Sequence, residues 1–170
     1  MALSGAGGGP LNPDARVPTL FGPALTFADR LAAADILPDR FAALAIDLAA
    51  THLFADLDAG LASRVERGSV LVAGHGLGHG PGGEAAAGAL AAAGFIAVVA
   101  ASYADGFDAH CLIAGLPPLE VDAPSTFHTG QRVRLNCEAG TIANLSSGDR
   151  QPIRNATEAM LARLRAVLGR

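Results

Sequence analysis

Cysteine is scarce in this sequence, and the positions of the two cysteines exclude two kinds of chemistry. Cys111 and Cys137 lie far apart and form no C-x-x-C pair. A disulfide framework needs several paired cysteines, and a self-contained metal–thiolate site needs closely spaced ligands. We therefore expect neither a disulfide scaffold nor a metal site on this chain.

Charge is also sparse. Asp, Glu, Lys and Arg make up 16% of the residues, and the net charge is -4. Binding to nucleic acid or to an anionic membrane needs a cluster of basic residues, and the sequence shows no such cluster. We therefore expect no nucleic-acid or membrane partner, and small neutral or anionic molecules remain as ligands. A chain of 170 residues suffices for one domain with a buried core.

One long uncharged run, residues 85–104, is long enough to span a membrane, which takes about 20 residues. Its composition changes at Gly94, however. The residues before it are mostly alanine, whereas those after it are β-branched or aromatic. This order predicts a helix that ends at a glycine, followed by a buried strand of a soluble protein.

The beginning of the sequence, residues 1–18, is rich in Gly, Pro and Ala and lacks the charged start and apolar centre of a signal peptide. We expect a disordered tail there, a single domain over residues 19–170, and a cytoplasmic protein.

The middle of the sequence predicts a βαβ unit. Residues 69–74 and 95–101 are buried strands by their apolar composition, and residues 84–93 between them form an alanine-rich helix. Such a unit implies parallel strands with a right-handed crossover. A strand at residues 25–27 and helix over 42–65 precede it, and a helix over 104–114 and a strand near 116–121 follow.

The last third predicts antiparallel structure. Residues 131–137 alternate apolar and polar side chains, a turn follows, and residues 141–145 return, which is typical of a hairpin. Asn155, with Glu158 three residues later, resembles a capping box that starts a final helix. Together the elements predict an α/β fold, a compact β/β/α domain of three layers with a mixed sheet.

The segment with the clearest chemical content is the glycine loop, which we define as residues 74–84 and which contains six glycines among eleven residues. It joins a predicted strand to a predicted helix. Glycines allow successive N–H groups to converge, and a helix start favours negative charge, so a carboxylate or phosphate is the expected ligand. The alternative is that the loop is a flexible connector with no functional role.

Two other interpretations of the loop are weaker. Gly78, Gly80 and Gly83 match G-x-G-x-x-G, but four residues separate them from the strand and no acidic residue ends the next strand. His75 and His79 would align as a metal pair only on a helix, which this glycine content disfavours. A histidine that faces a substrate is more credible. His52 and His110, in predicted helices, are interpreted as packing residues.

The strand 70–74, the glycine loop and the segments 93–100, 102–104 and 115–117 resemble, in order and spacing, the small subunit of 3-isopropylmalate dehydratase and its homoaconitase relatives. Residues 36–41 resemble that family's I-[IL]-P-A-R-[YF] segment, and residues 138–148 its terminal hairpin. The resemblance implies a swivelling β/β/α domain that closes over a large subunit holding a four-iron four-sulfur cluster. In such enzymes the cluster acts as a Lewis acid on a 2-hydroxy acid, and the small subunit supplies substrate contacts and the base.

The chain departs from the family in this loop. Where the family has G-x-G-S-S-R-E-H-A, residues 78–86 read Gly-His-Gly-Pro-Gly-Gly-Glu-Ala-Ala, so both serines, one of them the family's base, and the carboxylate-binding arginine are missing. Residues 32–35 likewise replace a D-T-D stretch. We predict His79 as the substitute base and His75 as the second candidate. The predicted substrate contacts are Arg40, Ala43, Gly80, Pro81, Gly82, Gly83 and Glu84.

These features predict the small subunit of a heteromeric hydro-lyase, with its cluster on the partner subunit. In the family, the position of Ala43 tends to be arginine when a third carboxylate is bound and apolar when the substituent is alkyl. The predicted substrate is therefore a 2-hydroxy diacid with a small or apolar substituent. The alternatives are a non-catalytic binding or regulatory subunit of the same fold and, third, a nucleotide-binding module.

Overall fold

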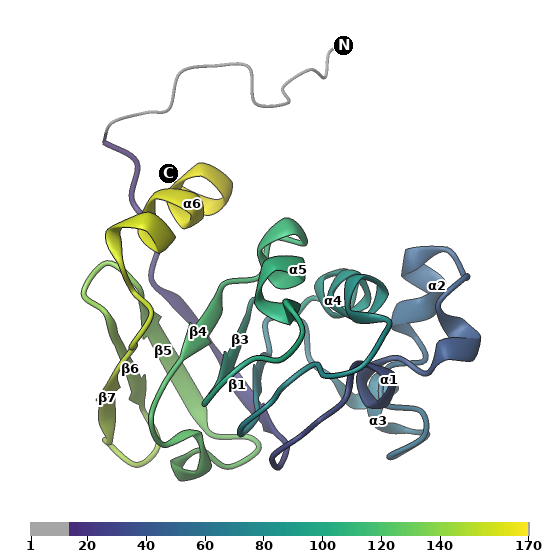
Figure 1. Ribbon diagram of the computed structural model, residues 1–170. Coiled ribbons are helices and arrows are strands. Elements are labelled where there is room, and N and C mark those ends of the chain that lie inside the picture. Colours follow the sequence, from purple (N-terminus) through teal and green to yellow (C-terminus); the bar gives the residue numbers. More distant parts are fainter. Residues whose placement is uncertain (1–13, 170) are drawn as a thin grey trace.

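The protein is built on one curled, mixed sheet of seven strands in the order β4-β3-β2-β1-β5-β6-β7 (Figure 1). The computed structural model describes residues 14–169. Strands β1 (Leu20–Thr26), β2 (Val70–Val72), β3 (Ala97–Ala100) and β4 (Pro118–Glu120) are parallel. Strands β5 (Arg132–Asn136), β6 (Thr141–Asn144) and β7 (Arg150–Pro152) continue the sheet antiparallel, with β5 paired to β1.

The parallel half contains the predicted βαβ unit, formed by β2, helix α4 (Gly83–Ala92) and β3. The apolar strands are buried on both faces. Leu71 of β2 and Val98 of β3 belong to one core, whereas their neighbours Val70 and Val99 belong to another. This alternation follows from the two-residue period of a strand, and it explains why these sequences are apolar without interruption.

Helices cover one face of the parallel half (Figure 1). They are α1 (Ala33–Ile36), α2 (Ile46–Ala50), α3 (Leu61–Arg64), α4 and α5 (Phe107–Ile113), with a 3₁₀ turn at Asp39–Phe41. The other face packs against residues of the antiparallel half and of α6 (Glu158–Leu168), and a 3₁₀ turn at Pro124–Thr126 precedes β5. The predicted three-layer β/β/α arrangement is thus confirmed.

The uncharged run at residues 85–104 forms most of α4, a left-handed turn at Gly94 with φ of 97°, and β3. Within residues 14–169 no helix combines the length and the apolar character needed to cross a membrane. The interpretation of this run as a helix followed by a strand is confirmed.

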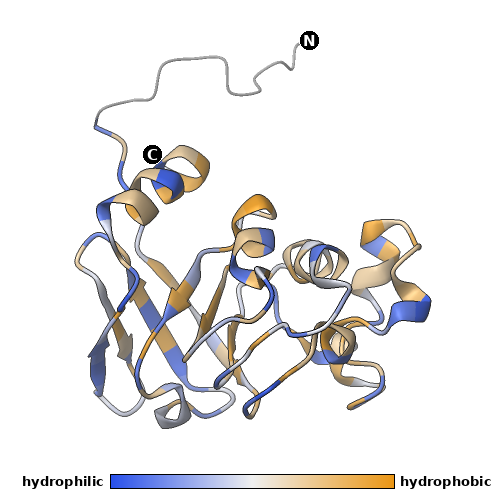
Figure 2. Ribbon diagram, in the orientation of Figure 1, coloured by the Kyte–Doolittle hydropathy of each residue, from blue (hydrophilic) through white to orange (hydrophobic). Residues whose placement is uncertain are grey.

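Several boundaries differ from the sequence expectations. Strand β1 starts at Leu20 instead of residue 25, because its first half pairs with β5. The helix expected over residues 42–65 is limited to α2 and α3, with turns between them. Strand β7 was not expected at all, because its residues are polar (Figure 2) and only pairing with β6 makes it a strand.

The final helix begins later than predicted. Its N-cap is Thr157, whose side chain accepts a hydrogen bond from the Met160 N–H at 3.2 Å. Asn155 instead bridges to β4, where its Oδ1 accepts from the Glu120 N–H and its Nδ2 donates to the Pro118 carbonyl. The capping box predicted at Asn155 is therefore wrong, since a long-range contact takes that side chain.

The ordered core also begins before the predicted boundary at residue 19. Val17 is only 4% exposed, and its N–H donates to Glu138 Oε1 at 2.8 Å. Residues 1–13 of the predicted tail lie outside the described residues. The same Glu138 carboxylate accepts hydrogen bonds from Arg165 Nε and Nη2 at 2.9 and 2.6 Å, so one carboxylate connects the N-terminal segment, the β5–β6 turn and α6.

This junction predicts a pH dependence of stability. The hydrogen bonds from Arg165, assisted by the Val17 N–H, lower the pKa of Glu138 from 4.5 to about 2. A lowered pKa in the folded state contributes stability that is present above pH 4.5 and is lost as the pH falls from 4.5 to 2. Thermal unfolding of Glu138→Gln should therefore lie below that of the parent at pH 6, and the two melting temperatures should converge toward pH 2. A constant difference over that range would contradict this role.

Candidate functional site

The glycine loop crosses the carboxyl end of the parallel sheet between β2 and α4. Glycine is required most clearly at Gly78. Its φ is +84°, and a Cβ added there would lie 2.2 Å from Cγ of the buried Phe107 ring. The loop backbone therefore contacts α5 directly, and no side chain fits between them.

Hydrogen bonds hold the first half of the loop, which is therefore not a loose connector. The His75 N–H donates to Asp29 Oδ1 at 2.7 Å, and the Gly76 N–H donates to Ser102 Oγ at 2.9 Å. The Gly80 N–H donates to Asp105 Oδ2 at 2.9 Å. These N–H groups have partners within the chain, so the donors left for an anion are those of the α4 start, where the first helical N–H groups have no intrahelical acceptor.

His79 is held in one orientation by the segment before α1. Its Nε2 lies 2.9 Å from the Arg30 carbonyl oxygen, and its own carbonyl accepts from the Ala33 N–H. A carbonyl oxygen only accepts hydrogen bonds, so Nε2 carries the hydrogen and Nδ1 is the nitrogen of neutral His79 that can take a proton. Arg30 has a left-handed φ of 61°, a conformation that non-glycine residues adopt at a cost.

His75 lies elsewhere. It is exposed and lines a separate hollow of about 360 Å³, together with Asp29 and Asp122. The two histidines proposed as bases therefore do not share one cavity.

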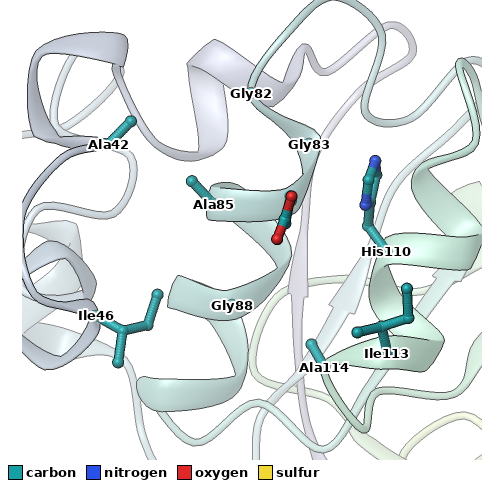
Figure 3. A pocket seen from close by; sticks show the side chains of 10 residues that line it. Ala42, Ile46, Gly82, Gly83, Ala85, Gly88, His110, Ile113 and Ala114 are labelled. Atoms are coloured by element: carbon teal, nitrogen blue, oxygen red, sulfur yellow. The ribbon is translucent and has the colours of Figure 1, made fainter.

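A groove of about 890 Å³, which we call the α2–α4–α5 groove, lies beside the end of the loop (Figure 3). Of the predicted substrate contacts it includes Gly82, Gly83 and Glu84, whereas Gly80, Pro81 and both candidate bases are outside its lining. The complete lining is Ala42, Ile46, Gly82, Gly83, Glu84, Ala85, Gly88, His110, Ile113 and Ala114.

His110 is the site residue that sequence reasoning missed. The sequence assigned it to packing, yet its ring lines the groove and points toward the start of α4 (Figure 3). Its Cδ2 lies 3.0 Å from where a Cβ on Gly83 would stand, so the absence of a side chain at Gly83 makes room for this imidazole. No sequence signal places α5 against the loop. His52, in contrast, stacks on Phe41 with ring centroids 3.9 Å apart, as a packing residue would.

The other predicted contacts lie at the edge of the groove. Ala43 is exposed and adjoins Ala42 of the lining. Arg40 donates twice to the Asp56 carboxylate, at 2.6 and 3.1 Å, and its guanidinium lies 4.6 Å from the centre of the Phe41 ring. The hydrogen bonds from Arg40 lower the pKa of Asp56. Arg40 is therefore engaged by an acidic neighbour on the surface, and only its N–H groups that do not face Asp56 are left for a substrate carboxylate.

The two cysteines do not fit an iron–sulfur cluster. Both are buried, and burial raises the pKa of Cys111 to about 12 and that of Cys137 to about 11. They belong to different cores, and their thiols stay protonated at neutral pH, whereas metal ligands are thiolates. Within residues 14–169 no group of three or more His, Cys, Asp or Glu residues is arranged to hold a metal ion.

Comparison with known proteins first indicates the structural class of the chain. The aconitase C-terminal domain family matches residues 57–124, which span β2 to β4 and include the glycine loop. The crystal structure of 3-isopropylmalate dehydratase from Methanocaldococcus jannaschii superposes with a TM-score of 0.76 at 24% identity, over 88% of this chain and 93% of that one. This likeness shows that the two proteins share a fold.

Curated relatives then identify the family. The chain is 38% identical to the 3-isopropylmalate dehydratase small subunit of Moorella thermoacetica, over 61% of this chain and 63% of the relative. It is 32% identical to that of Pyrobaculum neutrophilum, over 82% and 89%. It is also 31% identical to the methanogen homoaconitase small subunit of Methanothermobacter thermautotrophicus, over 80% and 79%. The chain belongs to the family of 3-isopropylmalate dehydratase and homoaconitase small subunits.

Proposed function

We propose that the chain is the small subunit of a cytoplasmic hydro-lyase that works with a large, cluster-bearing subunit on a 2-hydroxy diacid with a small or apolar substituent. The observation that carries this is the position of the glycine loop. It lies between β2 and α4, in the part matched by the aconitase C-terminal domain, and opens onto a groove at Gly82, Gly83 and Glu84. The names of the relatives as small subunits support a partner chain.

The geometry supports the following roles for the residues. The free N–H groups at the start of α4 suit a substrate carboxylate, since donors and helix dipole both favour an anion there. His79, with Nε2–H held by Arg30, offers Nδ1 to accept the proton from the carbon next to the hydroxyl group. Because Cys111 and Cys137 do not fit a cluster, the Lewis-acid chemistry is assigned to the large subunit.

Reconstitution tests the proposal. The chain is co-expressed anaerobically with a large subunit of the same family, and formation of the unsaturated diacid is followed by its ultraviolet absorbance. We expect no cluster and no turnover with the chain alone, and turnover with the pair. A stoichiometric cluster on the lone chain would refute the subunit assignment.

The missing Ser-Ser-Arg stretch supports a second candidate, a binding or regulatory subunit that has lost the reaction. In that case the pair would assemble and bind diacids without turning them over. The same reconstitution therefore separates the two candidates.

The groove edge predicts a substrate preference. Ala43 supplies no charge to compensate the desolvation of a third carboxylate, so the pair should prefer a diacid to a tricarboxylate. Replacing Ala43 by Arg should shift the ratio of kcat/KM toward the tricarboxylate by about 10- to 100-fold, the range that one hydrogen bond to a charged group provides. A preference of the parent pair for the tricarboxylate would contradict the assignment.

A further inference from the structure

The α2–α4–α5 groove is polar at one end and apolar along the rest. Among the described residues that line it, only Glu84 and His110 carry a titratable group. The remaining lining consists of glycine, alanine and isoleucine, and no arginine contributes to it within the described part of the chain. A groove of this composition suits the uncharged part of a ligand better than a second carboxylate, because a carboxylate placed there would lose its hydration without gaining a cation.

Two large apolar side chains of the groove are left open to solvent. Ile46 of α2 is 45% exposed, and Ile113 of α5 is 84% exposed. Single exposed apolar residues are common on protein surfaces. These two, however, line one groove from opposite sides of α4 (Figure 3). An apolar group lying between them would remove both from water.

Gly88 lines the groove and lets Ile46 of α2 lie close to α4. It stands in the interior of α4, where glycine costs about 0.5–1 kcal/mol relative to alanine. An added Cβ would lie 2.9 Å from Ile46 Cδ1, which is the movable end of an exposed side chain. Helix stability alone would therefore favour alanine here. Glycine therefore preserves the close approach of Ile46 to α4, and a side chain at this position would displace Ile46 from the wall of the groove.

The size of the groove agrees with an extended ligand. Its volume of about 890 Å³ lies near the upper end of the roughly 300–1,000 Å³ range of small-molecule sites. A methyl or isopropyl substituent would leave most of this space empty.

We propose that this groove binds an extended apolar substituent of the substrate, so that the substrate class is a 2-hydroxy diacid carrying an alkyl or aryl chain longer than isopropyl. The inference rests on the proposed function. The diacid end lies at the glycine loop, and the chain runs along α4 between Ile46 and Ile113. The specificity-determining residues are Ala85 and Gly88, because both line the groove and a side chain added at Gly88 would displace Ile46.

Binding of non-reactive analogues tests this independently of turnover. The affinity of the reconstituted pair for 2-alkylsuccinates of increasing chain length is measured by calorimetry. Each buried methylene should lower Kd by about fourfold until the groove is filled. Ala85→Leu and Gly88→Ala, two independent ways to narrow the groove, should raise Kd for the longest ligand by tenfold or more. Their affinity for methylsuccinate should change much less than their affinity for the longest ligand.

Ala109→Leu is the matched control, because Ala109 is an exposed alanine of α5 outside this lining. It should leave every affinity unchanged. The proposal is wrong if Kd is independent of chain length, if no alkylsuccinate binds, or if both narrowing variants keep the parent's affinities. It is also wrong if Ala85→Leu weakens assembly of the pair instead of ligand binding, since the large subunit would then fill the groove.

Turnover is measured in a separate assay from binding. A pair that binds long alkylsuccinates but converts no alkylmalate refutes the proposed hydro-lyase and leaves the groove assignment standing. A pair that converts short alkylmalates but gains no affinity for longer chains supports the hydro-lyase and refutes the groove assignment.

Discussion

Replacement of His79 by Gln is expected to lower turnover of the reconstituted pair by about 10²–10⁴-fold, the usual effect of losing a general base. The structure indicates that this substitution removes the basic nitrogen and keeps the hydrogen bond. The Gln amide can still donate to the Arg30 carbonyl, as His79 Nε2 does now, but it offers no basic nitrogen in place of Nδ1. Loss of rate with an unchanged KM and an unchanged melting temperature would separate the chemical role from a structural one.

Two further histidines serve as comparisons. His75→Gln tests the second candidate base, and a smaller effect is expected because His75 lines a different hollow. His110→Gln tests the imidazole that faces Gly83. If His79→Gln and both comparison variants turned over within a few-fold of the parent, the base would have to lie on the large subunit.

A second large effect is expected at Gly78. Alanine there would adopt an unfavourable left-handed conformation, costing about 1–2 kcal/mol, and its Cβ would overlap the Phe107 ring, costing about 1–3 kcal/mol more. Urea denaturation of Gly78→Ala should therefore show a loss of about 2–5 kcal/mol in the free energy of unfolding.

Gly80 provides the matched control for this prediction. Its φ of +81° is nearly the same as that of Gly78, but no heavy atom lies within 4 Å of an added Cβ. Gly80→Ala should therefore lose only the conformational part, about 1–2 kcal/mol. Equal losses in the two variants would show that overlap of the added Cβ with the Phe107 ring costs no stability.

Much of the fold follows from local sequence. The runs that became β2 and β3 are apolar throughout, Gly94 ends α4 in a left-handed turn, and alternation over β5 marks its buried face. Burial, turn chemistry and periodicity act over a few residues, so they are readable without a structure. The same holds for the glycine loop, whose composition and place between strand and helix indicated a backbone that approaches other groups closely.

The site depends instead on contacts between distant segments, which no local pattern encodes. Packing of α5 onto the loop turns His110 from a presumed core residue into a wall of the groove, opposite Ile46 of α2. The Arg30 carbonyl selects which nitrogen of His79 can act as a base, and the Asp105 carboxylate takes the Gly80 N–H from the predicted anion site. Each of these contacts joins residues far apart in the chain. They form because the sheet topology brings the loops that follow the parallel strands to one edge of the sheet.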